Sequence, residues 1–268
     1  MMYKFFSHAL LLLVLMPGLL GAAERLRLAT TTSTENSGLL AVLHPPFESQ
    51  YDVKVDVIAV GTGKALKLGE NGDVDVVLVH APAAEIKFVE SGFGVKRLPV
   101  MHNDFVLLGP DVDTAGLRRA GTLVNAMSRL TAGEASFVSR GDDSGTHKKE
   151  MSLWRSAGIK PSGNWYLSVG QGMGAVLKIA NDKLAYTLAD RGTYLAFRNQ
   201  LDLEIAFAGA DELYNPYHVI LMNPDRHPHV KVDLARRYMD FIRSEQGQSI
   251  IKNFRIAGEQ LFHPVVVE

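Results

Sequence analysis

The sequence has no cysteine among its 268 residues. This absence excludes disulfide bonds, thiol nucleophiles and metal sites built on thiolates. It also leaves no residue that could carry a lipid after an export signal, so we expect no lipid anchor. Any binding or catalytic chemistry must therefore come from hydroxyl, amide, imidazole, carboxylate or cationic groups.

The sequence also lacks an excess of charge of either sign. It contains 28 lysine and arginine residues against 29 aspartate and glutamate residues, a formal net charge of −1. A chain this close to neutral does not attract nucleic acid or anionic lipid surfaces. If the ligand is an anion, local hydrogen-bond donors have to bind it, because the overall field of the protein does not.

Residues 1–23 have the pattern of an export signal. Lys4 provides a positive start, an apolar run covers Ala9–Leu20, and the small residues Gly21–Ala23 follow. The run is shorter than the roughly 20 residues that span a bilayer. We therefore expect cleavage after Ala23 and a mature protein that is free in the periplasm of a bacterium with two membranes. No later segment is long and apolar enough to predict a membrane span.

The rest of the sequence repeats one pattern, in which a short apolar strand leads into a polar, glycine-rich loop and then a helix. The predicted strands are, in chain order, 26–29, 53–60, 74–79, 137–138, 166–169 and 184–188. Strands that alternate with helices in this way form mainly parallel sheets with helices on both faces. We therefore predict an α/β protein with parallel or mixed sheets flanked by helices.

Two similar segments, 102–110 and 215–224, are both apolar strands bounded by turn residues. A pair of strands of this kind is suited to join two lobes that close on a ligand. We therefore predict two lobes, the first formed by residues 24–105 and 220–268 and the second by residues 106–219. The alternative is that both segments are ordinary core strands of a single sheet.

Four polar loops have the composition of an anion site at the start of a helix. They are Thr-Thr-Ser at 31–33, Gly-Thr-Gly at 61–63, the stretch from Arg to Ser-Gly-Thr at 140–146, and Gly-Gln-Gly at 170–172. A helix N-terminus exposes unpaired N–H groups at the positive end of its dipole, and nearby hydroxyls add donors. Because strands of open α/β sheets end at the ligand crevice, we predict one cleft lined by both lobes. The alternative for any single loop is that its Ser or Thr only caps the helix.

Arg140 and its acidic neighbours leave one question open. Its planar guanidinium suits bidentate contacts with oxyanion oxygens, although a salt bridge to Asp142, Asp143 or Asp190 would also account for it. A carboxylate facing the ligand could only accept a proton, which suits an anion still protonated at neutral pH, such as phosphate. If Asp142 and Asp143 instead orient Arg140 or cap the helix, the cleft contains only donors and suits a fully deprotonated dianion.

Catalytic and metal-binding motifs are incomplete in this sequence. It has neither the full dinucleotide fingerprint nor a Gly-Lys-Ser or Gly-Lys-Thr phosphate loop. Ser144 precedes His147 by three residues, but no third group is in place to orient the histidine, so an exported serine hydrolase is the less favoured alternative. His227 and His229 are interpreted as a surface pair and not as a metal site. We expect no cofactor and no enzymatic activity.

Several stretches resemble the TupA-type family, the tungstate-binding components of bacterial ABC importers. The matching stretches are Ala29–Leu40 (ATTTSTENSGLL), Val60–Gly63 (VGTG), Asp73–Val76 (DVDV), Arg140–His147 (RGDDSGTH), Ala189–Tyr194 (ADRGTY) and Asn215–Tyr217 (NPY). The resemblance covers nearly the whole mature chain. Phosphate-binding proteins carry a stretch like 140–146, whereas the threonine-rich first loop and the continuation at 147–150 fit the tungstate family better.

The resemblance implies a two-lobed periplasmic binding protein fold of type II and a tungstate or molybdate ion held only through its oxygens, with no protein ligand on the metal centre. At the matching positions it points to Thr31, Thr32, Ser33, Thr62, Arg140, Ser144 and Thr146 as ligand-binding residues. Additional candidates in the loops are Gly61, Gly63, Gly145 and Gly172. The implied partners are an ABC-transporter permease and its ATPase, with the binding protein itself a monomer. Phosphate or sulfate in the same cleft is the nearer alternative, and donor loops do not distinguish tungstate from molybdate.

Overall fold

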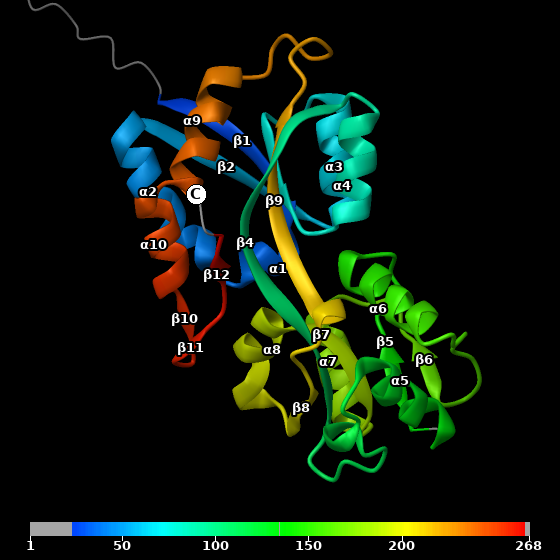
Figure 1. Ribbon diagram of the computed structural model, residues 1–268. Helices are drawn as coiled ribbons and strands as arrows, with labels where there is room; N and C mark the ends of the chain where they lie inside the picture. Colours follow the sequence, from blue (N-terminus) through cyan, green and yellow to red (C-terminus); the bar gives the residue numbers. More distant parts are fainter. Residues whose placement is uncertain (1–22, 134, 266–268) are drawn as a thin grey trace, which may run out of the picture.

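The computed structural model describes residues 23–133 and 135–265, which form two stacked lobes (Figure 1). The predicted export signal, residues 1–23, lies outside the described residues apart from Ala23. Strands β4 (Gly94–Pro110) and β9 (Tyr214–Met222) run between the lobes. None of the helices in the described ranges combines the length and the apolar character that crossing a membrane requires.

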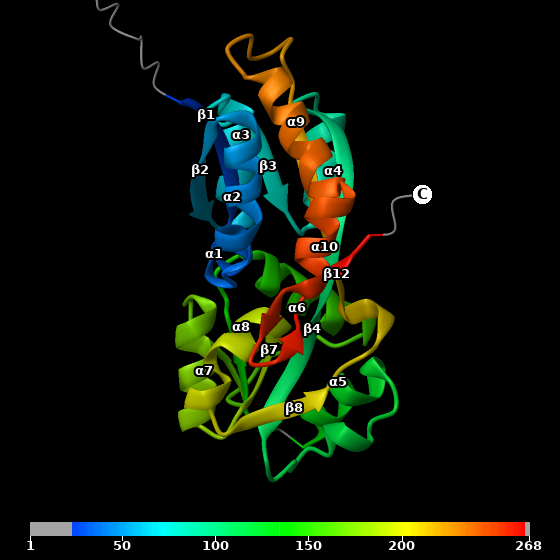
Figure 2. The same ribbon diagram turned by 90° about the vertical axis from the view of Figure 1, so that its left-hand side faces the viewer.

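The N-terminal and C-terminal parts of the chain together build the first lobe. Its sheet has the strand order β2, β1, β3, β9 and β4; the first three strands are parallel, and β9 is antiparallel to both of its neighbours. Helices α2, α9 and α10 lie on one face of this sheet, and α3 and α4 lie on the other (Figures 1 and 2). The bounds of these elements are β1 Glu24–Thr31, α1 Thr32–Asn36, α2 Leu39–Tyr51, β2 Val53–Val60, α3 Thr62–Asn71, β3 Val76–Val79, α4 Pro82–Glu90, α9 Val232–Arg243, α10 Glu245–Asn253, β10 Arg255–Ile256, β11 Glu259–Gln260 and β12 His263–Pro264.

The middle of the chain builds the second lobe. The strand order there is β4, β7, β5 and β6, with β8 also paired to β4. Because β4 belongs to both lobes, these strands and β12, which also pairs with β4, form one mixed, ten-stranded sheet. Strands β10 and β11 form a separate two-stranded sheet. The predicted fold class is confirmed. The bounds are η1 Leu117–Arg119, α5 Leu123–Ala132, β5 Phe137–Ser139, α6 Gly145–Ser156, β6 Tyr166–Ser168, α7 Met173–Asp182, β7 Tyr186–Asp190, α8 Arg191–Phe197, η2 Arg198–Gln200, β8 Leu203–Phe207 and η3 Asp211–Leu213.

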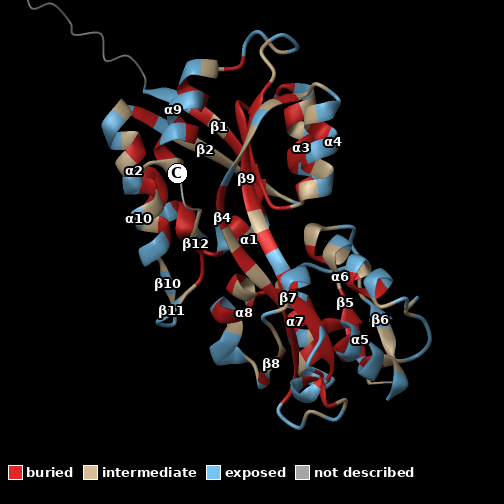
Figure 3. Ribbon diagram, in the orientation of Figure 1, coloured by how far each residue is buried: buried red, intermediate tan, exposed pale blue. Residues whose placement is uncertain are grey.

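Burial follows the strands (Figure 3). All four residues of β3 are buried, because this strand lies inside the sheet and helices cover both of its faces. This explains the continuous apolar run Val76–Val79, which directly follows Asp75. Strand β2, at the edge of the sheet, is only partly buried along most of its length, which agrees with its alternating sequence.

Strands β4 and β9 pair with each other over residues 94–104 and 214–222. Beyond this paired stretch, β4 continues to Pro110 in the sheet of the second lobe. The pairing has two register shifts within residues 95–101, and bulges of this kind bend and twist a strand. The two-strand connection is therefore present. That it acts as a hinge, and that the lobes divide after residues 105 and 219, stay predictions.

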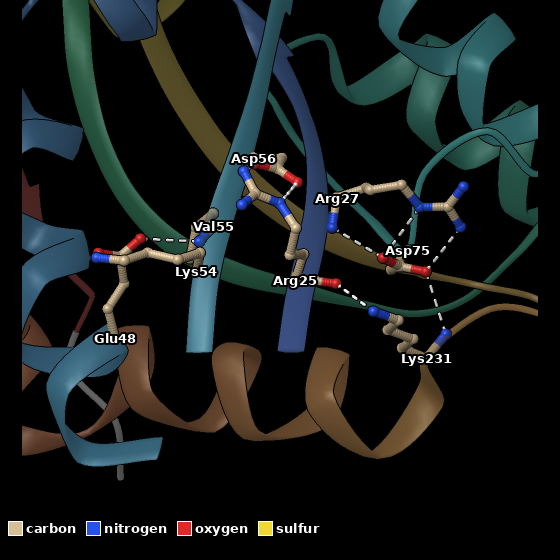
Figure 4. Close-up of polar contacts among 8 residues, drawn as sticks. All are labelled: Arg25, Arg27, Glu48, Lys54, Val55, Asp56, Asp75 and Lys231. Carbon is tan, nitrogen blue, oxygen red and sulfur yellow. Dashed lines mark hydrogen bonds and ion pairs between the residues drawn. The ribbon is translucent and has the colours of Figure 1, made fainter. Parts of the chain in front are cut away.

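Asp75 is a buried carboxylate immediately before β3 that joins three segments of the first lobe (Figure 4). It accepts hydrogen bonds from the backbone N–H groups of Arg27 at 2.8 Å and Lys231 at 3.1 Å. The Arg27 guanidinium pairs with the same carboxylate at 3.0 Å. A buried charge is stable only with such a complete set of partners. Asp75 thus holds β1, the start of β3 and the start of α9 together.

We expect Asp75→Ala to lower the free energy of unfolding by about 3 kcal/mol, because Arg27 and the Lys231 N–H lose a buried acceptor. The matched control is Asp56→Ala, which removes the partner of the exposed Arg25 on the neighbouring strand and should change stability little. Urea denaturation followed by circular dichroism measures both. Equal midpoints for the two variants would contradict the role given to Asp75.

Candidate functional site

Three of the four predicted loops meet where the strands end. Thr31 at the end of β1 lies opposite Val60 at the end of β2, so α1 and α3 begin side by side. The loop after β5 brings the start of α6 to the same place. These loops line a small cavity of about 20 Å³. The lining residues are Thr31, Thr32, Ser33, Val60, Gly61, Thr62, His80, Arg140, Ser144, Gly145 and Thr146.

All seven residues predicted to bind a ligand lie in this lining, and so do two of the four additional glycines. Gly63 and Gly172 lie outside it. Gly63 is one position further into α3, and the 170–172 loop packs behind Arg140, where the Gln171 N–H donates to the Arg140 carbonyl at 3.2 Å. Val60 and His80 line the cavity without having been predicted. The ligand-binding roles of all these residues stay predictions.

Two of the lining hydroxyls also cap helices, which is the alternative role considered for these loops in the sequence analysis. Thr31 Oγ1 accepts from the N–H of Thr34 at 3.3 Å, and Ser144 Oγ accepts from the N–H of His147 at 3.3 Å. A hydroxyl oxygen that accepts in this way still has its own O–H to donate. Capping a helix and donating into the cavity are therefore compatible for Ser144. The Thr31 hydroxyl also lies within hydrogen-bond distance of other lining or neighbouring groups, Ser33, Thr34 and His80.

Thr62 lies in the same lining but has no capping role. It is buried, and its hydroxyl has no hydrogen-bond partner among the described residues. A buried hydroxyl without a partner is costly, so it marks a position where a ligand would satisfy it. A Cβ added to Gly145 would lie 3.2 Å from Thr62 Oγ1. Because α3 lies in the first lobe and α6 in the second, the two lobes approach each other closely at this point.

The carboxylates next to Arg140 do not line the cavity. Asp142 accepts from Arg140 Nε and from the Ser144 N–H, both at 3.2 Å. Burial favours a higher pKa for Asp142, but these hydrogen bonds outweigh it and hold the pKa below its usual value. The Asp143 side chain is 84% exposed and pairs with Lys148. Within the described part of the chain, no carboxylate lines the cavity, and Asp142 instead orients Arg140.

A buried network lies beneath the Arg140 loop. Glu150 of α6 accepts from the hydroxyl of Ser139 at 2.7 Å, from the hydroxyl of Tyr166 at 2.7 Å and from the indole of Trp154 at 3.1 Å. Burial raises the pKa of Glu150, and the three hydrogen bonds oppose that rise. Since Ser139 directly precedes Arg140, the network anchors the base of the loop. Trp154 is buried in the core of the second lobe, and the partly buried Tyr166 packs against that core.

The other motifs weighed from the sequence have structural partners. His147 Nδ1 accepts from the Asp143 N–H at 3.0 Å, so its ring is not positioned as a base for Ser144. His227 and His229 direct Nε2 at backbone carbonyls at the end of α3, at 3.0 and 2.8 Å. Among the described residues, no three His, Asp or Glu side chains group as a metal site would require.

Larger hollows occur elsewhere on the surface. One of about 970 Å³ lies between α2 and α10, and most of its lining surface is apolar. It contains none of the helix-opening loops. The chemistry of the loops, and not the size of the hollow, therefore locates the candidate site.

Comparisons with known proteins agree with this geometry. A family model described as a PBP superfamily domain matches residues 21–246. The chain is 46% identical over 241 residues to the tungstate-binding protein TupA of Peptoclostridium acidaminophilum, covering 88% of this chain and 84% of that protein. It is 56% identical to the solved tungstate ABC transporter protein from Geobacter sulfurreducens, with a TM-score of 0.81 over 87% of this chain and 100% of that one. It is 45% identical to the solved tungstate binding protein TupA from Desulfovibrio alaskensis G20, with a TM-score of 0.82 over 91% and 99%.

We expect Gly145→Ala to weaken the binding of a tetrahedral oxyanion by about tenfold or more, since crowding in a packed contact typically costs about 1–3 kcal/mol. The added methyl would lie 3.2 Å from Thr62 Oγ1 and oppose closure. Gly172→Ala is the control, because Gly172 also opens a helix of the second lobe but its added Cβ meets nothing within 4 Å. Titration calorimetry gives both affinities; the same affinity in both variants would show that closure does not depend on this contact.

Proposed function

Because this chain belongs to the PBP superfamily and, within it, to the TupA family of tungstate-binding proteins, we propose that it captures tungstate for import by an ABC transporter. Its relatives are binding proteins of transport systems, and the chain is accordingly a binding protein and not an enzyme. The ligand would be held by hydrogen bonds to its oxygens, without a cofactor and without a bond from the protein to the metal centre.

The observation that carries this proposal is the chemistry of the cavity lining. Hydroxyl-bearing side chains, helix starts, the His80 imidazole and the Arg140 side chain line it, and no described carboxylate does. Such a lining suits an anion that has no proton left to donate, which describes tungstate at neutral pH. Phosphate retains a proton in that range, and the lining offers it no carboxylate, only hydroxyl oxygens and the His80 imidazole as acceptors. The lining therefore favours a fully deprotonated anion, and sulfate, molybdate and phosphate are the anions to compare with tungstate.

Binding would use both lobes at once. The starts of α1 and α3 supply donors from the first lobe, and the start of α6 with Arg140 supplies donors and charge from the second. Closing the cleft removes water from the anion, which strengthens each of these charge-assisted contacts. The approach of Thr62 to Gly145 is the contact at which the lobes would meet.

The transport role implies partners and a location. We infer that the closed, loaded protein docks on a membrane permease whose ATPase drives release, as the ABC-transporter setting of the relatives suggests. We further infer that it acts as a monomer in the periplasm after cleavage at Ala23. The pattern of residues 1–23 supports this location.

We expect titration calorimetry at pH 7.5 to show tighter binding of tungstate than of sulfate or phosphate, with molybdate as the comparison of nearly equal size and charge. A thermal shift measured with each anion provides an independent check, because a ligand that binds only the folded state raises the melting temperature. Phosphate binding more tightly than tungstate would refute the proposal.

We expect Arg140→Ala to weaken tungstate binding by about 2–5 kcal/mol, because it removes the one guanidinium in the lining and leaves the anion without that charge-assisted contact. Arg155→Ala is the control, since Arg155 is an exposed arginine in the last turn of α6, at the opposite end from the cavity. Titration calorimetry with tungstate gives the affinity of both variants. An Arg140 variant that keeps the affinity of the control would remove Arg140 from the site.

A further inference from the structure

His80 lines the cavity from the first lobe, immediately after β3. It is 6% exposed, and its ring stacks on Tyr217 of β9 with the ring centroids 4.5 Å apart and the planes 18° from parallel. The ring is thus held rigidly between the sheet and the cavity. A buried imidazole fixed beside an anion cavity is a group whose charge can change when the anion arrives.

The hydrogen bonds of His80 determine which ring nitrogen carries the proton. Asn215 donates its side-chain N–H to Asn103 Oδ1 at 2.6 Å, which leaves Asn215 Oδ1 as the acceptor for His80 Nδ1 at 2.9 Å. This orientation of the two amides favours the tautomer of the neutral ring that is protonated at Nδ1. Nε2 then carries a lone pair, and this nitrogen lies 3.2 Å from Thr31 Oγ1 and 3.4 Å from Ser33 Oγ, two hydroxyls of the cavity lining.

Charged groups surround His80 on several elements. Burial holds the pKa of His80 below its usual value, and Arg140 across the cleft adds to this effect. The hydrogen bond from Nδ1 to Asn215 and the carboxylates of Asp190 in β7 and Glu85 in α4 act in the opposite direction. The stacked Tyr217 is neutral, since burial raises its pKa further above the physiological range. The ring is therefore neutral at neutral pH while the cavity holds no anion.

A bound dianion changes this balance. The lone pair of a neutral Nε2 repels an anion oxygen, whereas a protonated Nε2 donates a charge-assisted hydrogen bond to it. A double negative charge beside the ring also favours the cationic form. The proton comes from solvent and adds to the Nε2 lone pair, while Nδ1 keeps its own proton for Asn215.

We propose that His80 takes up one proton as the oxyanion binds and then donates from Nε2 to an anion oxygen. The first lobe then contributes a positive charge through His80, in addition to Arg140, which lines the cavity from the second lobe and is itself paired with Asp142. This inference rests on the proposed function, and it names the group that makes binding depend on pH.

The direction of the pH dependence follows from linkage. The pKa of His80 is lowered in the free protein and is raised by the anion, so binding takes up a proton at pH values between the two. Within that window the dissociation constant rises as the pH rises, by up to about tenfold per pH unit for one proton. Above the window the ring stays neutral in both states, and the pH dependence levels off.

The test is titration of the full chain with tungstate between pH 6.5 and about 8.5, at each pH in two buffers of different ionisation enthalpy. A binding enthalpy that changes with the buffer measures proton uptake directly, and we expect on the order of one proton in the wild type. His80→Gln keeps an amide donor but cannot take up the proton, so it should lose the uptake and flatten the pH profile. His263→Gln removes an exposed histidine and should leave both unchanged.

The outcomes separate this inference from the proposed function. Tungstate binding by the wild type without proton uptake, or uptake that persists in His80→Gln, would overturn the role of His80 alone. Failure of the wild type to bind tungstate at any pH in the series would overturn the proposed function. Because the buffer comparison is made on the wild type, it decides the question even if His80→Gln folds poorly.

Discussion

An anion that is taken out of water has to meet donors on every side, and this requirement governs the design of the cleft. Removing a charge from solvent is costly unless partners replace the lost hydration. The parallel register of β1 and β2 brings two helix starts together, and the loop after β5 adds a third from the other lobe. Asp142 serves the same requirement from behind, since it holds Arg140 while staying outside the cavity lining.

The fold and most of the candidate site were accessible from the sequence because their signals are local. Each loop follows directly on an apolar strand and opens a helix, so Thr31, Thr62 and Ser144 are adjacent in sequence to the elements that position them. The same local logic also included Gly172, whose loop has the right composition. In the fold this loop packs behind Arg140, outside the lining, and only the three-dimensional contacts reveal this.

His80 shows what local patterns do not contain. It follows a buried strand without any glycine-rich loop, and its partner Asn215 is 135 positions away in the chain. The orientation of Asp142 likewise depends on the backbone geometry of the loop. Its carboxylate accepts from the Arg140 side chain, two residues before it, and from the Ser144 N–H, two residues after it. The residues around Arg140 showed that Asp142 and Asp143 could either face the ligand or point away from it. Only the three-dimensional structure shows the direction of their carboxylates.

Strand β4 has a mechanical meaning beyond its place in the sheet. It passes through both lobes as one continuous paired strand, and β9 accompanies it over much of its length (Figure 1). Sliding of one lobe past the other would break the ladder between these strands, whereas gradual bending and twisting would keep every rung. We expect the connection to bend as a continuous pair of strands and not to flex as a loose linker. Such bending would let the emptied cleft open without breaking the pairing of β4 with β9.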